Sequence, residues 1–240
     1  MFAALANPHR FLAFSRWAAP ILALVATVLI AWGVWLGLNA PPDYQQGETV
    51  KIMFIHVPAA WTSMLAYACL GGASFISLVF RHALADAAAK ACAPLGAAFT
   101  GMSLVTGSLW GRPMWGAWWV WGDARLVSVL VLFLLFLGYL ALRASIDDEA
   151  KGARAAEILA LVGLINLPII KFSVDWWNTL HQGDSIMRAG GSALAPVYMT
   201  PLLLAGAGFS MAFGALWLVR IRGEIWRRRA NSLALQAALA

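Results

Sequence analysis

The sequence predicts an all-α, polytopic membrane protein in which six transmembrane helices form a single membrane domain over residues 1–240. Of the 240 residues, 62% are hydrophobic and only 12% are charged, and the mean hydropathy is +0.75. A soluble globular protein needs more polar surface than this composition provides. Six separate apolar stretches are each long enough to cross a hydrocarbon core of ~30 Å at ~1.5 Å per residue.

The six predicted spans cover residues 17–38, 57–80, 91–109, 126–143, 156–174 and 196–219. Arg10 and Arg16 precede the first span, as in a secretory signal, but the span is too long for one, so we expect a retained helix. Pro168 is expected to kink the fifth span. Within that span, Asn166 and Lys171 should face a cavity or a partner, and Lys171 lies close enough to the outer end to reach it.

Three further features of the chain bear on its surroundings and its chemistry. After the sixth span, Trp226 stands beside a run of arginines, which predicts a short helix lying on anionic lipid. Cys69 and Cys92 form no CxxC pair and indicate neither a disulfide framework nor a thiol-exchange site. The chain has no GxxxxGK[ST] phosphate loop, so any ATP-driven step must come from a partner.

The distribution of basic residues predicts that both termini are cytoplasmic. In this orientation twelve of the 17 lysines and arginines lie on the cytoplasmic side, in agreement with the positive-inside rule. The five on or near the outer side are Lys51, Arg112, Arg125, Lys171 and Arg188. The net charge of +6 therefore reflects orientation, and we expect no nucleic-acid partner.

A tryptophan-rich segment over residues 110–125, between the third and fourth spans, then faces away from the cytoplasm. Its tryptophans are Trp110, Trp115, Trp118, Trp119 and Trp121. Indole rings gather at membrane interfaces and around flat aromatic ligands. If the segment were one helix, indole would cover about half of its surface, opposite a face of small residues. An aromatic belt that only anchors the protein in the membrane is the alternative.

Two histidines are placed at the same outer level as this segment. His56 lies at the mouth of the second span, and His181 follows the fifth span, 125 residues later. A lone interfacial histidine is usually structural, but two that flank a tryptophan-rich segment favour a ligand site. Neutral imidazole is a good axial ligand of haem iron, and the porphyrin supplies the other four nitrogens. A zinc site is less favoured because no Cys, Glu or Asp cluster accompanies the histidines.

Charged residues near the segment suit the same ligand, a non-covalently bound haem b. Arg125, Lys51, Arg112 and Arg188 could each meet a propionate. Asp123 could orient an indole N–H or an arginine. The alternative for each is contact with lipid headgroups or an ordinary salt bridge.

Three stretches of the chain carry a family resemblance. The run WGRPMWGAWWVWGDARL resembles the WWD signature of the haem-handling proteins of cytochrome c biogenesis. The segments KIMFIHVPAAW and FSVDWWNTLHQG, with the six spans, are similar to the haem exporter C (CcmC) family of the bacterial system I pathway. The resemblance implies that His56 and His181 are axial haem ligands at the periplasmic face of the inner membrane. It also implies that the five tryptophans, with Asp123 and Arg125, form a platform for haem and its acceptor.

The family also implies partners. These are a membrane-anchored haem chaperone that becomes covalently attached to haem, a small single-span accessory subunit, and an ABC-type ATPase and permease pair. The family pattern runs W-G-x-W-W-x-W-D, whereas here Gly122 separates Trp121 from Asp123. In a helix the extra residue would rotate Asp123 by ~100°, whereas in a turn the glycine can absorb it.

The function expected from these features is haem delivery, without a catalytic acid, base or nucleophile of the protein's own. One alternative is a b-type redox protein passing electrons between quinol and haem, but such proteins usually hold histidines within their helices. Another is the permease subunit of an ABC transporter, which needs a passage lined by polar groups. The spans offer few such groups beyond Asn166 and Lys171.

Overall fold

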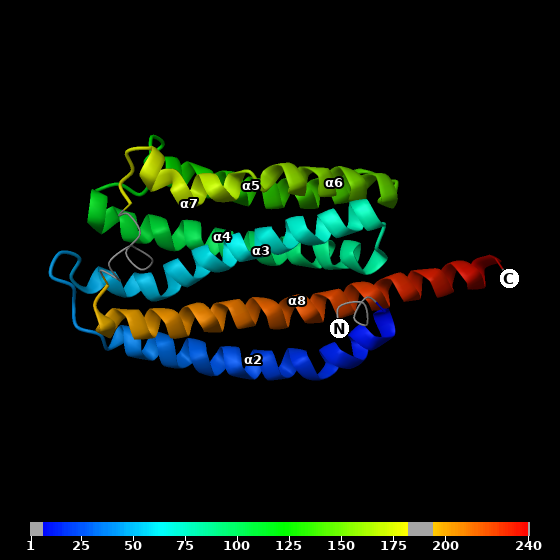
Figure 1. Cartoon of the computed structure of the whole chain (residues 1–240), viewed down its shortest axis with the longest axis horizontal. Coiled ribbons are helices and arrows are strands. Elements are labelled where there is room, and N and C mark those ends of the chain that lie inside the picture. Colours follow the sequence, from blue (N-terminus) through cyan, green and yellow to red (C-terminus); the bar gives the residue numbers. More distant parts are fainter. Residues whose placement is uncertain (1–6, 182–193, 240) are drawn as a thin grey trace.

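The computed structural model describes residues 7–181 and 194–239, and the regular elements in these ranges are helices, with one isolated bridge between Asp43 and Gly47. The elements are α2 (Pro8–Leu38), the 3-10 helix η1 (Glu48–Ile52), α3 (Met53–Phe80), α4 (Ala83–Trp115), α5 (Ala124–Ser145), α6 (Glu149–Gly163), α7 (Asn166–Trp176) and α8 (Pro196–Leu239). They run side by side along the long axis of the molecule (Figure 1).

Six helical segments of the described chain are long and apolar enough to cross a membrane, when η1 with α3 and α6 with α7 are each taken as one segment. This confirms the predicted all-α fold with six spans. Each predicted span lies within one of these segments, and the helices extend beyond it. The first helix, for example, begins at Pro8 instead of residue 17, because Asn7 accepts the N–H of His9 and caps it there.

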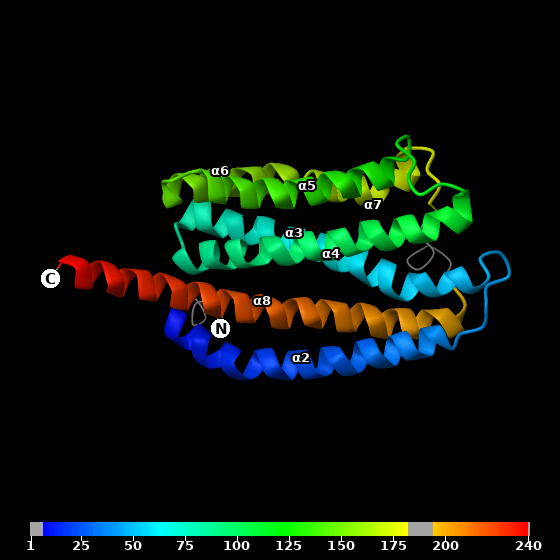
Figure 2. The same ribbon diagram turned by 180° about the vertical axis from the view of Figure 1, so that it is seen from behind.

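The helices pack in pairs. α2 lies along α8, α3 along α4, and α5 along α6 and α7, with the α3–α4 pair between the other two (Figures 1 and 2). Close packing of α2 on α8 depends on small residues. A side chain at Gly33 would place its Cβ 2.6 Å from the backbone nitrogen of Ala205, a contact that only glycine avoids.

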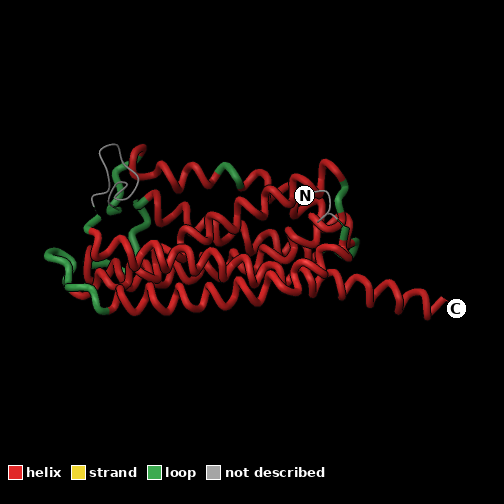
Figure 3. Tube along the Cα trace, turned by 60° about the horizontal axis from the view of Figure 1, so that its bottom comes forward, coloured by secondary structure: helices red, strands yellow, loops and turns green. Residues whose placement is uncertain are grey.

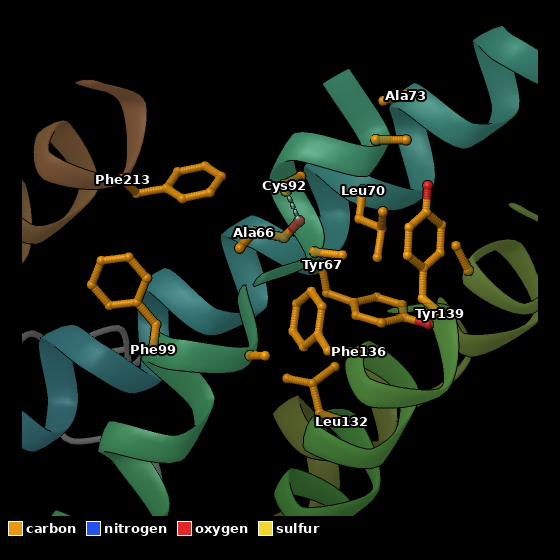
Figure 4. Close-up of a cluster of buried hydrophobic side chains, with 14 of the residues drawn as sticks. Ala66, Tyr67, Leu70, Ala73, Cys92, Phe99, Leu132, Phe136, Tyr139 and Phe213 are labelled. Carbon is orange, nitrogen blue, oxygen red and sulfur yellow. Dashed lines mark hydrogen bonds between the residues drawn. The ribbon is translucent and has the colours of Figure 1, made fainter. Parts of the chain in front are cut away.

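A fully buried aromatic cluster joins the α3–α4 pair to α5. Tyr67 of α3 meets Phe136 of α5 edge to face, with ring centroids 5.0 Å apart, and Leu132 and Tyr139 pack beside them (Figure 4). Cys92 of α4 is also buried there and donates its S–H to the Ala66 carbonyl. This core fixes the middle of the bundle.

The fifth span is interrupted between α6 and α7, so the kink predicted at Pro168 is confirmed. The interruption falls at Leu164 and Ile165, because the proline ring removes the hydrogen bond to the residue four positions earlier and clashes with its carbonyl. There the N–H groups of Leu164 and Ile165 bond three residues back instead of four. Figure 3 shows the break as a short loop within a helical path. Asn166 donates to the Ser128 carbonyl at 2.9 Å, so it faces α5.

The C-terminal tail differs from its prediction. Residues after Arg220 do not form a separate short helix, because α8 continues without a break to Leu239 and projects beyond the bundle (Figure 1). Glu224 lies three and four residues before Arg227 and Arg228 and forms ion pairs of 2.6 and 2.7 Å with them. These pairs stabilise the helix beyond the predicted end of the sixth span at residue 219.

The two ends of the bundle have different contents. The described N- and C-terminal residues share one end with the turns at 81–82 and 146–148. The opposite end gathers the loop of residues 39–47, the tryptophan-rich segment and the chain that follows α7 (Figures 1 and 3). This is the alternation of loops that the charge distribution predicted.

Candidate functional site

His56 lies in the first turn of α3 and is held by α4. Its Nδ1 is 3.1 Å from the Ser103 carbonyl and 3.1 Å from the Thr106 hydroxyl oxygen. The Thr106 hydroxyl donates its own proton to the Met102 carbonyl at 2.7 Å, so both neighbours of Nδ1 act as acceptors. Nδ1 therefore carries the proton, and the lone pair of Nε2 is available to a metal.

Two residues of α4 shape the space around this imidazole. Gly107 lies beneath the ring, where an added Cβ would stand 2.9 Å from Cε1 of His56. Trp110, one turn later, meets the ring edge to face at a centroid distance of 5.7 Å. The indole N–H of Trp110 donates to Oε1 of Gln46 at 3.1 Å, which fixes the indole against the 39–47 loop.

His181 reaches the same end of the bundle from the chain after α7. Its ring lies 5.1 Å from the ring of Trp115, the last residue of α4, at an interplanar angle of 61°. Trp110 and Trp115, which contact the His56 and His181 rings respectively, lie five residues apart on α4. The structure thus brings together two histidines 125 residues apart, each in contact with one tryptophan of α4.

Asp123 stands behind His181. The carboxylate is 2% exposed and accepts two backbone N–H groups, from Leu126 at 2.9 Å and from Leu180 at 2.7 Å. The first bond caps α5, and the second ties down the residue before His181. Nδ1 of His181 lies 3.5 Å from Oδ1 of Asp123, just beyond hydrogen-bond geometry, and has no other partner among the described residues.

The ionised form of the Asp123 carboxyl is strongly favoured. Burial alone raises the pKa of this carboxyl, but the neighbouring His181 ring and the N–H groups of Leu126 and Leu180 outweigh burial and lower the pKa to about 2. Asp123 is therefore ionised over the physiological range and faces His181 as a carboxylate.

The tryptophan-rich segment is helical only in its first part. α4 ends at Trp115 because Gly116 adopts a left-handed conformation with φ of 74°, and residues 116–123 are not helical. A single helix through the segment is therefore wrong. Gly122 lies in a turn closed by a 3.1 Å bond from the Asp123 N–H to the Val120 carbonyl. The turn accommodates the extra residue, and Asp123 caps the N-terminus of α5.

The remaining three tryptophans lie away from the histidine contacts. Trp118 and Trp121 are 56% and 75% exposed. Trp119 is partly buried and meets Trp121 at a centroid distance of 5.6 Å. Its indole N–H is buried and has no partner among the described residues. The five tryptophans thus fall into two groups, one against the imidazoles and one at the surface.

The basic residues predicted to meet propionates make contacts within the protein. Lys51 pairs with Glu48 at 2.6 Å. Arg125 donates to the Ser173 hydroxyl at 3.1 Å and to the Lys171 carbonyl at 3.2 Å, and so connects α5 to α7. Arg112 donates to the Gly116 carbonyl, and Arg188 lies outside the described residues.

Four residues of the site were not anticipated from the sequence: Gln46, Ser103, Thr106 and Gly107. The last three share one face of α4 with Trp110, at spacings of three, four and seven residues. That pattern of small and hydroxyl residues, running into a tryptophan one turn later, is a signal that the sequence analysis missed. Gln46 has no comparable signal, because its contact depends on how the 39–47 loop folds.

Comparisons with known proteins identify the family. A family model described as "CcmC: Heme exporter protein C" matches residues 1–236. The chain belongs to this family. A "Heme exporter protein C" of Bradyrhizobium diazoefficiens is 57% identical over 234 residues, which cover 98% of this chain and 89% of the relative.

Two more distant relatives of the same printed name agree with this membership. The protein of Escherichia coli strain K12 is 47% identical over 222 residues, which cover 92% of this chain and 89% of the relative. That of Paracoccus denitrificans is 43% identical over 229 residues, which cover 95% of each chain. Together with the six apolar helices, this makes the chain a multi-pass membrane protein of the haem exporter C family.

Proposed function

We propose that this haem exporter C chain binds haem non-covalently, as haem b, between His56 and His181 and delivers it to a membrane-anchored haem chaperone. One observation carries the proposal. Both imidazoles turn Nδ1 toward the protein, His56 to the Ser103 carbonyl and His181 to Asp123, which leaves each Nε2 to bind iron. Iron-binding histidines generally need such a partner on the other ring nitrogen, because it fixes the tautomer and the ring orientation.

The surrounding residues have distinct roles in this proposal. Trp110 and Trp115 limit the rotation of the two imidazoles and offer aromatic edges to a porphyrin. Asp123 is a positioning residue, which acts on haem through His181. Lys51 and Arg125, at the same end of the bundle, supply positive charge for the propionates.

The exposed tryptophans of the segment form the platform for the acceptor. Trp118 and Trp121 present large aromatic faces at the end of the bundle that holds both histidines. The chain supplies no catalytic acid, base or nucleophile in this proposal, so covalent attachment of haem takes place on the chaperone. A small single-span subunit and an ABC-type ATPase and permease pair assist, because the chain has no phosphate loop of its own.

The site faces the periplasm in this proposal, and the protein lies in the bacterial inner membrane with both termini in the cytoplasm. Twelve of the 17 basic residues then lie on the cytoplasmic side. The arrangement of loops at the two ends of the bundle supports this topology, because the loops beside His56 and His181 lie at the end opposite the termini (Figure 1).

The test is the visible spectrum of the protein purified in mild detergent with its haem chaperone co-expressed. His56→Ala and His181→Ala are each expected to lose the bis-histidine spectrum and chaperone loading. His82→Asn is the control, since this histidine caps α4 at the opposite end and asparagine caps helices well. Protein free of haem in every preparation would overturn the proposal, and reversible reduction of a retained haem by quinol would indicate a redox protein instead.

A further inference from the structure

A pocket lies at the end of the bundle that carries the termini, opposite the end that holds His56 and His181. Its volume is about 300 Å³, and it lies between the beginning of α2, the beginning of α4 and the later part of α8. Leu12, Leu84 and Ile225, one from each helix, contribute an apolar lining, while His9, Arg228 and Arg229 stand at its polar side. The pocket therefore combines an apolar interior with a basic rim.

The two arginines of the rim differ in their partners. Arg228 is neutralised, because its guanidinium contacts Asp86 at 2.5 Å and Glu224 at 2.7 Å. Arg229 lies over the ring of Trp226 at 5.5 Å and within 3.5 Å of Nε2 of His9. Among the described residues no carboxylate stands within ion-pair distance of Arg229, and residues 1–6 contain no acidic side chain.

Within the described ranges, Arg229 thus places a permanent positive charge without a carboxylate partner beside an apolar pocket. Arginine stays protonated under all relevant conditions, so its charge must be compensated by solvent or by a bound anion. Guanidinium binds phosphate oxygens in a bidentate manner. Indole side chains such as that of Trp226 favour the interface between lipid headgroups and acyl chains. A ligand that matches both the basic rim and the apolar interior of the pocket has an anionic phosphate next to a hydrocarbon chain.

We propose that this pocket binds an anionic phospholipid of the leaflet at the terminal end of the bundle. The phosphate contacts Arg229 beside His9, and an acyl chain lies against Leu12, Leu84 and Ile225. The lipid thereby joins three helices that belong to two different pairs, α2 and α8 on one side and α4 on the other. The site is separate from the proposed haem site, so the failure of one proposal leaves the other intact.

Native mass spectrometry of the full chain, titrated with phosphatidylglycerol or with phosphatidylethanolamine, tests the proposal. Wild type should retain phosphatidylglycerol in preference to the zwitterionic lipid. Arg229→Gln should weaken retention about fivefold, the effect of one basic residue at an anionic surface. Arg154→Gln, which removes the same charge from an exposed position of α6 at the same end, should have no comparable effect.

A second variant separates a built pocket from general surface attraction. Ala83 is exposed and lines the pocket, so Ala83→Phe fills the space while every charge is kept. If an acyl chain occupies the pocket, this variant should lose phosphatidylglycerol about as strongly as Arg229→Gln. Unchanged retention in either variant, or equal loss in Arg154→Gln, would overturn the proposal. Displacement of phosphatidylglycerol by haemin from wild type would assign the pocket to haem and overturn it as well.

Discussion

Asp123 accepts the backbone N–H of Leu180 at 2.7 Å, and the bond ties the residue before His181 to the first turn of α5. The same carboxylate caps α5 by accepting the N–H of Leu126. The position of one proposed iron ligand, His181, therefore depends on a side chain 58 residues away in the sequence.

Asp123→Asn should weaken haem binding. Asparagine can still cap α5, but it removes the negative charge that faces Nδ1 of His181, and such partners of iron ligands typically contribute about 10–100-fold in metal affinity. Haem titrations followed in the visible spectrum measure the change. Asp148→Asn is the matched control, because Asp148 caps α6 at the opposite end through the N–H groups of Ala150 and Lys151. Equal haem affinity in Asp123→Asn and wild type would contradict the positioning role.

The same carboxyl predicts a pH dependence of stability. Its pKa in the folded protein is about 2, below the ordinary value of 3.8. Because the pKa is lower in the folded protein, the ionised Asp123 carboxylate adds to the free energy of unfolding. This contribution is complete at pH values above the pKa of the unfolded chain, near 4, and is lost as the pH falls toward 2. Unfolding in detergent can be followed by tryptophan fluorescence. As the pH falls from 4 to 2, the stability of wild type should approach that of Asp123→Asn. A stability difference that stays constant from pH 6 to pH 2 would argue against the assignment.

Gly107→Ala should disturb the His56 ring. The added Cβ would lie 2.9 Å from Cε1, closer than van der Waals contact allows, so the imidazole must move or α4 must shift. We expect haem affinity to fall about tenfold or more, with a change in the bis-histidine spectrum. Gly101→Ala on the same helix is the control, because its Cβ would meet Phe133 at an ordinary 3.5 Å. The same loss of haem in both variants would point to a general effect on α4.

The two groups of tryptophans should respond differently to substitution. Trp115→Phe removes the indole that contacts His181 and should change the haem spectrum and weaken haem retention. Trp121→Phe changes a side chain that is 75% exposed and should leave the spectrum unaltered while slowing transfer to the chaperone. Single-turnover transfer assays on protein loaded with haem separate the two effects. Identical behaviour of the variants would show that the segment acts as one unit.

Hydropathy and charge were sufficient to predict the six spans and their alternation, because crossing the apolar core fixes both the length and the composition of a helix. The shared level of His56 and His181 follows from that alternation. The helix ends were less predictable, since they depend on local bonds. α8 continues through its arginines because of pairs to Glu224, and Gly116 ends α4 because it adopts a positive φ that composition alone does not specify.

Roles that depend on folded loops were the least predictable. Nothing in the spacing of Asp123 and Leu180 indicates that one accepts a bond from the other, because the contact exists only when the chain after α7 folds back over α5. For the same reason Arg125 was expected near a propionate, whereas the structure also gives it a connection between α5 and α7. A sequence pattern predicts which residues reach an end of the bundle, but not which of them support the others.

The length of α8 connects features that stand far apart. A helix of 44 residues extends ~66 Å, and this one runs continuously from the end of the bundle that holds His56 and His181 to the projecting C-terminal tail. Near its start Tyr198 donates to the Pro41 carbonyl at 3.0 Å, in the loop that also carries Gln46, the partner of Trp110. A single helix therefore links the loop that supports the indole beside His56 to the opposite end of the molecule.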